Sequence, residues 1–134
     1  MKLITWNVQW FCGLDGRIDV ARVLQRAREW ADFDVLCLQE VAVHYPRLQG
    51  DASHDQVALL REALPGYEVA FAAAVDELAP DGRTRQRFGN VIASRLPVLQ
   101  LLPQMLPYPA APGVRSMPRI ALTATLRAPG GRCA

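Results

Sequence analysis

Two polar side chains lie near the ends of two short apolar runs, and they are the residues whose chemistry needs explaining. Asn7 closes the run at residues 3–8, and Glu40 closes the run at residues 34–41. An ionised carboxylate at the end of a buried strand loses its hydration, which is destabilising unless a cation or hydrogen-bond donors compensate. The sequence therefore predicts a positive group beside Glu40.

One helix-length segment separates the two runs. Residues 17–31 carry apolar side chains at the spacing of one buried helical stripe, namely Val20, Val23, Leu24, Ala27, Trp30 and Ala31. A strand, a helix and a strand form a βαβ unit with parallel strands and a right-handed crossover. Parallel strands end at the same edge of a sheet, so Asn7 and Glu40 are expected to meet there, where open α/β sheets bind ligands.

One more helix and several strands are expected in the rest of the chain. Ser53 and Gln56 have the spacing of a capping box, which predicts a helix that ends before the Pro65-Gly66 pair. Short β-rich segments follow at residues 67–72, 89–94, 98–102 and 120–126.

The connections between these elements also have sequence signals. Leu96-Pro97 is a tight turn that favours an antiparallel hairpin. Residues 44–51 form a polar segment that leads out of the second strand, and residues 83–87 form a basic loop. Residues 103–118 contain five prolines and are expected to form an irregular surface connection, and residues 128–134 resemble a turn.

Composition indicates a single globular domain over residues 1–134, with 51% hydrophobic and 21% charged residues. The formal net charge of +2 does not by itself indicate a nucleic-acid or membrane partner. The three cysteines have no metal-binding spacing, and their odd number favours a reducing compartment, so we expect a cytoplasmic protein. No segment approaches the ~20 apolar residues of a membrane span.

Three segments resemble the endonuclease/exonuclease/phosphatase family of metal-dependent phosphoesterases. They are ITWNVQ at residues 4–9, DVLCLQEV at residues 34–41 and FGNVIASR at residues 88–95. The second is the most specific, because a Gln-Glu pair ends an apolar strand about thirty residues after a strand that ends in Asn. The resemblance covers nearly all of this chain and about the first half of the family's domain.

This resemblance implies a fold and a chemistry. The fold is α/β, half of a four-layer α/β/β/α sandwich, with a mixed sheet and two helices on one face. The implied cofactor is Mg²⁺ or Mn²⁺ with Glu40 as its ligand, and Asn7 helps to organise the metal and phosphate site. Asn90 and Arg119 are expected to bind substrate. The substrate is a phosphate ester, which in the family is DNA, RNA, a phospholipid head group or an inositol phosphate.

The chain departs from the family in one important respect. The family's catalytic Asp-x-Asn motif and its closing Asp-His pair do not occur in this sequence, and His44 and His54 are in the wrong places to replace the missing histidine. We therefore expect the isolated chain to have little or no activity. We also expect self-association, because half of the sandwich would leave one sheet face uncovered.

Two other functions and several simpler roles stay open from the sequence alone. The chain could be a non-catalytic α/β module for binding or assembly, or a flavodoxin-like nucleotide-binding domain, although it lacks a glycine-rich loop after the first strand. Glu40 could pair with an arginine, and Asn7 could cap a turn. Asn90 could belong to a turn, and Arg119 could be solvated.

Overall fold

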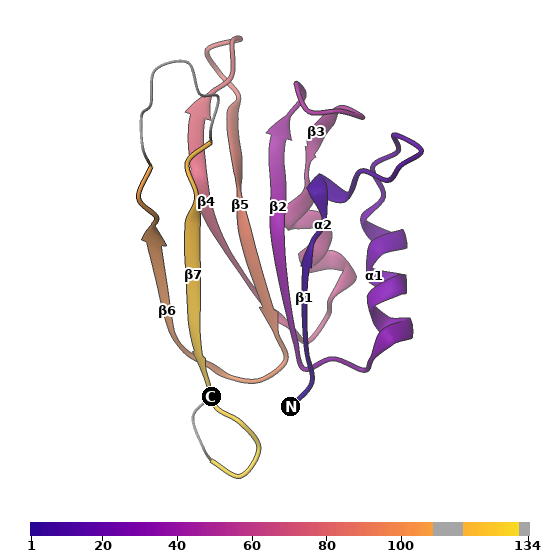
Figure 1. Ribbon diagram of the computed structural model, residues 1–134, viewed down its shortest axis with the longest axis vertical. Coiled ribbons are helices and arrows are strands. Elements are labelled where there is room, and N and C mark those ends of the chain that lie inside the picture. The colour runs from indigo at the N-terminus through magenta and orange to yellow at the C-terminus, as the bar shows by residue number, and fades with distance from the viewer. Residues whose placement is uncertain (109–116, 132–134) are drawn as a thin grey trace.

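The computed structural model describes residues 1–108 and 117–131, which form two β-sheets and two α-helices (Figure 1). The larger sheet has the strand order β1-β2-β5-β4 with β3 beside β2, and the smaller sheet pairs β6 with β7. The elements in chain order are β1 (Leu3–Asn7), the short turn η1 (Gln9–Phe11), α1 (Val20–Trp30), β2 (Val35–Tyr45), β3 (Ala52–Asp55), α2 (Gln56–Ala63), β4 (Glu68–Leu78), β5 (Arg85–Ser94), β6 (Val98–Met105) and β7 (Ile120–Leu126). None of the described helices is long and apolar enough to cross a membrane.

β1 and β2 are parallel, as the βαβ interpretation predicts. Their register pairs Leu3 with Val35 and Asn7 with Gln39, so Asn7 and Glu40 lie close together where β1 ends. The prediction that Glu40 ends its strand is wrong, because β2 continues to Tyr45 alongside β5 and β3. β5 runs antiparallel to both β2 and β4, and β3 runs antiparallel to β2. The larger sheet is therefore mixed, which confirms the predicted fold class.

Both helices pack on one face of the larger sheet (Figure 1). α1 buries Val20, Leu24 and Ala27 against the sheet, and α2 buries Val57 and Leu60. Fully burying a large aliphatic side chain stabilises a fold by roughly 1.5–3 kcal/mol. The cluster that these side chains form with the strands is the main core.

α1 begins at Val20, three residues later than the sequence predicts. Asp19 is its N-cap, and the Asp19 carboxylate accepts a hydrogen bond from the Arg22 N–H at 2.8 Å. Such a cap satisfies one of the free N–H groups of the first turn, so it decides where the helix starts.

The capping box predicted at the start of α2 is wrong. The N-cap is Asp55, whose carboxylate accepts a hydrogen bond from the Ala58 N–H at 2.9 Å. Ser53 belongs to β3, a strand that the sequence analysis missed. Gln56 is therefore the first residue of the helix, and its side chain turns into the protein instead of back to Ser53.

The smaller sheet covers part of the face opposite the helices, which was expected to be bare. Val98, Leu122 and Leu126 of this sheet pack on Val35 and Ile92 of the larger one. Two strands of a second sheet are thus present in this chain. Because this face is partly covered, it no longer supports the expected self-association, which stays a prediction.

The antiparallel hairpin predicted around Leu96-Pro97 is wrong. β5 already pairs with β2 on one side and β4 on the other, so neither of its edges is available to β6. β6 pairs with β7 instead. The Leu96 N–H donates to the Ser94 hydroxyl at 3.0 Å, in the turn where the chain leaves one sheet and enters the other.

Several strands are longer than their sequence signals. β2 continues to Tyr45 because β5 and β3 flank its second half, so His44 lies in a strand and not in a loop. β4 and β5 pair as far as Leu78 and Arg85, so most of the predicted basic loop is strand. Arg85 forms an ion pair with Asp76 at 2.7 Å.

β6 extends into the proline-rich connection. Pro103 lies within it, at a position that tolerates proline because β6 is an edge strand paired only with β7. The remaining predictions for residues 109–116 and 132–134, including Pro109, Pro112 and Cys133, lie outside the described residues.

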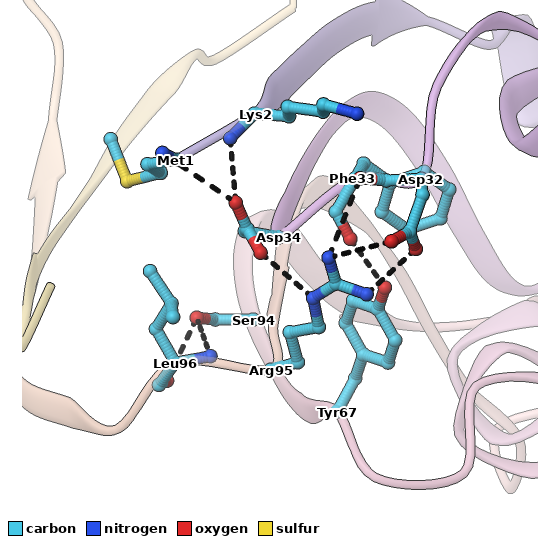
Figure 2. A network of polar contacts seen from close by, with 9 residues as sticks. All are labelled: Met1, Lys2, Asp32, Phe33, Asp34, Tyr67, Ser94, Arg95 and Leu96. Atoms are coloured by element: carbon cyan, nitrogen blue, oxygen red, sulfur yellow. Dashed lines mark hydrogen bonds and ion pairs between the residues drawn. The ribbon is translucent and has the colours of Figure 1, made fainter. Parts of the chain in front are cut away.

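An ionic cluster, shown in Figure 2, links three strand ends on the side of the larger sheet where β1 begins. Arg95, just after β5, donates to the Asp34 carboxylate at 2.8 Å and to the Asp32 carboxylate at 2.7 Å. The Lys2 N–H donates to Asp34 at 2.6 Å, and the N-terminal ammonium lies 3.8 Å from the same carboxylate. The cluster fixes the beginning of β1 and β2 to the end of β5.

We expect this cluster to make stability depend on pH in the acid range. The hydrogen bond from Arg95 lowers the pKa of Asp32, and the Lys2 N–H and then Arg95 lower the pKa of Asp34. Because both folded-state pKa values lie below the unfolded value of about 3.9, the stabilisation is fully present above that pH and is lost as the pH falls through the folded values. Thermal melts of Arg95→Met and the wild type should therefore differ at pH 7, begin to converge below about pH 3.9, and coincide once the pH is below the folded pKa values.

A matched control is Arg26→Met, which removes an ion pair with Glu29 between side chains that are 61% and 47% exposed. Exposed pairs of this kind contribute little to stability. Equal melting temperatures for Arg95→Met and Arg26→Met at pH 7 would contradict the role given to Arg95.

Candidate functional site

All four residues singled out in the sequence line one pocket of about 370 Å³. Asn7 ends β1, Glu40 lies in β2, Asn90 lies in β5, and Arg119 precedes β7. Gln39, beside Glu40, is a fifth polar lining residue that the sequence analysis did not single out. Parallel pairing of β1 with β2, and the packing of β7 over β5, bring these separate segments together.

Glu40 occupies a strained position in a β-bulge. Leu38 pairs with Val91 and Val41 with Gly89, so two residues of β2, Gln39 and Glu40, face a single residue of β5. Glu40 has φ of +62°, in the left-handed region, which costs a non-glycine residue roughly 1–2 kcal/mol. Bulges redirect side chains and are frequent beside active sites. The bulge therefore sets the direction of the Glu40 carboxylate.

The Glu40 carboxylate is half-buried, and its surroundings argue against a purely structural salt bridge. None of the ion pairs found within residues 1–108 and 117–131 involves Glu40 or Arg119. Among the described residues that line the pocket, Glu40 is the only acidic one and Arg119 the only basic one. The pocket thus places one negative and one positive side chain around a common space.

Asn7 combines a turn role with its place in the pocket. Its side-chain oxygen accepts a hydrogen bond from the Gln9 N–H at 3.0 Å, which is an Asx turn. The turn continues through Gln9, Trp10 and Phe11, whose φ angles are +45°, +46° and +60°. With the oxygen engaged in the turn, the amide NH₂ is the group of Asn7 that can donate to a phosphate.

Gln39 and Asn90 hold the walls of the pocket in place. The Gln39 amide donates to the Thr5 hydroxyl at 3.1 Å and so links β2 to β1. The Asn90 amide donates to the main-chain carbonyl of Ile120 at 2.7 Å and links the two sheets next to Arg119. In this structure Asn90 therefore positions the segment that carries Arg119, and its predicted contact with substrate stays a prediction.

The donor set of the pocket determines what metal could bind. Within the described residues there is no group of three or more His, Cys, Asp and Glu side chains that could hold a metal ion. Glu40 is instead a single carboxylate among amide side chains. Mg²⁺ is commonly bound by one or two carboxylates while it keeps several waters, so a pocket with this single carboxylate fits a partial Mg²⁺ or Mn²⁺ site and does not fit a closed protein cage.

A larger groove of about 790 Å³ lies along the outer edge of β1 and shares Asn7 with the pocket. Its walls include Trp6 and Trp30, whose ring centroids are 4.6 Å apart. Arg22 also lines this groove and pairs with Asp15 at 2.7 Å. Glu40 does not line the groove. The smaller pocket, which contains Glu40, is therefore the better candidate for a catalytic site.

A sequence model described as the endonuclease/exonuclease/phosphatase family matches residues 4–131. The chain belongs to the endonuclease/exonuclease/phosphatase family. Members of this family typically use divalent metal ions. The match extends over both sheets and over the four predicted site residues, so the family assignment covers the whole candidate site.

Solved structures of this family share the fold. An endonuclease/exonuclease/phosphatase from Beutenbergia cavernae DSM 12333 is 28% identical with a TM-score of 0.72, and the match covers 98% of this chain and 35% of that one. A family protein from Leptotrichia buccalis C-1013-b is 17% identical with a TM-score of 0.63, and the match covers 97% of this chain and 51% of that one. At this identity the likeness supports the fold alone. No curated protein matches the chain.

The chain thus spans between about a third and a half of the length of the solved structures that it matches. These coverages are consistent with a partial domain of the family, and its being the first half stays a prediction. The fold is a part of the family's sandwich: one mixed sheet with its two helices, and two strands of a second sheet.

Proposed function

We propose that this chain supplies one half of a metal-dependent phosphoesterase site, which hydrolyses a phosphodiester or phosphomonoester when the site is complete. The observation that supports this proposal is the convergence of Asn7, Glu40, Asn90 and Arg119, from four separate segments, on one pocket. Nucleic acid is one candidate substrate, together with phospholipid head groups and inositol phosphates.

Each pocket residue has a role that its chemistry suits. Glu40 would hold Mg²⁺ or Mn²⁺, and the ion would supply positive charge to the phosphoryl oxygens and to the leaving oxygen. The Asn7 amide donates to a phosphate oxygen and orients the ester. Arg119 lines the same pocket, where its guanidinium would balance the remaining phosphate charge. Asn90 keeps β7, and therefore Arg119, at the pocket.

Metal binding provides the direct test of this proposal. Titration with Mn²⁺, followed by electron paramagnetic resonance of the free ion, should show that Glu40→Gln weakens binding by more than about tenfold. Glu62→Gln on the exposed side of α2 is the control, because it makes the same chemical change away from the pocket. Equal Mn²⁺ affinity in the wild type and in Glu40→Gln would remove the support for a metal site and favour the non-catalytic binding module.

We expect the isolated chain to be inactive or nearly so. It has no Asp-x-Asn motif and no Asp-His pair, and therefore lacks the family's positioned acid–base groups. Groups of this kind contribute ~10²–10⁴-fold to a rate. With bis(p-nitrophenyl) phosphate and Mn²⁺, hydrolysis by the purified chain should not exceed that by Glu40→Gln. Robust turnover that Glu40→Gln abolishes would show that this half of the site suffices.

A further inference from the structure

Gln56, the first residue of α2, is a fully buried polar side chain that lies outside the pocket. A buried amide is destabilising unless its groups are bonded. Both ends of this amide have partners: its oxygen accepts from the Ala42 N–H at 2.9 Å, and its nitrogen donates to the Trp10 carbonyl at 2.8 Å. The two partners lie in segments that adjoin the candidate site.

The first of these bonds fills a gap in the hydrogen bonding of β2. Pairing with β1 ends at Gln39, and pairing with β3 begins at Val43, so residues 40–42 have no strand beside them on this edge. Glu40 and its bulge lie in this gap. The Gln56 oxygen takes the place of the missing strand for the Ala42 N–H, two residues beyond Glu40.

The second bond holds the left-handed turn that follows Asn7. Residues 9–11 all have positive φ, a conformation that L-residues keep only when their surroundings fix it. The Trp10 carbonyl in the middle of this turn accepts the Gln56 amide. The same turn contains the Gln9 N–H that binds the Asn7 side chain.

We infer that Gln56 is a positioning residue that fixes the Glu40 bulge relative to the Asn7 turn. The pairing of β1 with β2 ends at the Val8 N–H, which donates to the Gln39 carbonyl at 3.1 Å. After that point the Gln56 amide spans the two segments. The functional importance of this role rests on the proposed function, in which Glu40 binds metal and Asn7 binds phosphate. The positioning itself can be measured without activity.

The test compares Gln56→Met, Gln56→Glu and Val57→Ala with the wild type by amide hydrogen exchange and by Mn²⁺ titration. Methionine keeps the length of the side chain and removes both hydrogen bonds. Glutamate keeps the acceptor for the Ala42 N–H and loses the donor to Trp10. Val57→Ala perturbs the neighbouring buried residue of α2, which has an apolar side chain, and so controls for a general loss of stability.

Gln56→Met should accelerate exchange at Ala42 and at the bonded amides of Phe11 and Cys12, and should weaken Mn²⁺ binding roughly tenfold. Gln56→Glu should accelerate exchange in the turn and leave Ala42 protected. Val57→Ala should leave the Mn²⁺ affinity unchanged. If Gln56→Met binds Mn²⁺ as the wild type does, or loosens only the whole domain as Val57→Ala does, the inference is overturned.

The outcomes separate this inference from the proposed function. Should Glu40→Gln leave Mn²⁺ binding unchanged, the proposed metal site fails, and the exchange data alone decide whether Gln56 fixes the two segments. Should Glu40→Gln lose binding while Gln56→Met retains it, the metal site stands and the positioning role fails.

Discussion

Replacing Gly89 with alanine is expected to destabilise the fold by more than about 3 kcal/mol, beyond the usual range for overpacking. An added Cβ would collide with the Ala72 carbonyl oxygen and would come within 2.9 Å of the Ala73 Cα. Both are backbone atoms of the paired strand β4, so relief requires separation of β4 from β5. Urea denaturation followed by circular dichroism measures the loss, which for a small domain can abolish folding.

Gly13→Ala is a suitable control for this experiment. Its added Cβ would meet the ends of the Arg22 and Asp15 side chains, which can move aside. The position therefore tests the cost of a glycine substitution without a backbone collision. A Gly89→Ala variant as stable as Gly13→Ala would show that β4 and β5 are not held as closely as the structure has them.

The position of the candidate site follows from the sequence because it depends on a general rule of topology. Two β-rich runs separated by one helix form parallel strands, and this pairing brings Asn7, at the end of β1, next to Glu40 within β2. The rule needs no knowledge of distant contacts. The rule predicts that Asn7 and Glu40 lie close to each other. The packing of Asn90 and Arg119 against them depends instead on how the smaller sheet folds over β5.

The strand partners were harder to predict because they depend on segments far apart in the chain. The turn at Leu96-Pro97 is locally compatible with a hairpin, yet both edges of β5 are taken by β2 and β4. The missed strand β3 is short, and it is defined by its pairing with Val43 and Tyr45 instead of by its own composition. Residue propensities are local, so they predict neither the occupied edges of β5 nor the pairing that defines β3.

Gln56 and Gly89 each have a sequence signal that predicts a different role from the one that the structure shows. The spacing of Gln56 from Ser53 predicts a capping box, but Asp55 caps the helix and leaves the Gln56 amide to bind Ala42 and Trp10. The sequence predicts Gly89 at the start of a strand, whereas it lies inside β5 at a close backbone approach to β4. A glycine inside a strand is typical of such an approach.

The bulge at Glu40 was not predictable from residue types. Left-handed φ angles usually coincide with glycine or asparagine, and glutamate gives no such signal. A strained residue with a charged side chain, half-buried in a pocket, is nevertheless informative once it is seen. Strain of this kind persists where a side chain has a role that a more stable alternative would lose.

Glu40→Gly is therefore expected to stabilise the fold while it removes metal binding. Glycine adopts a φ of +62° without steric cost, so the free energy of unfolding should rise by about 1 kcal/mol. Mn²⁺ affinity should fall by more than about tenfold, because the carboxylate is gone. Urea denaturation measures the first effect, and Mn²⁺ titration measures the second. Glu40→Gln separates the two, since it keeps the strain and removes only the charge.

Asp51→Gly controls for the backbone effect, because Asp51 also has a positive φ, of +60°, and does not line the pocket. It should stabilise the fold to a similar extent and leave Mn²⁺ affinity unchanged. If Glu40→Gly destabilises the protein, the Glu40 carboxylate supports the fold itself. If the variant is more stable and binds Mn²⁺ normally, the strain at Glu40 has no connection with a metal. Only opposite changes in stability and affinity identify Glu40 as a residue retained for its chemistry.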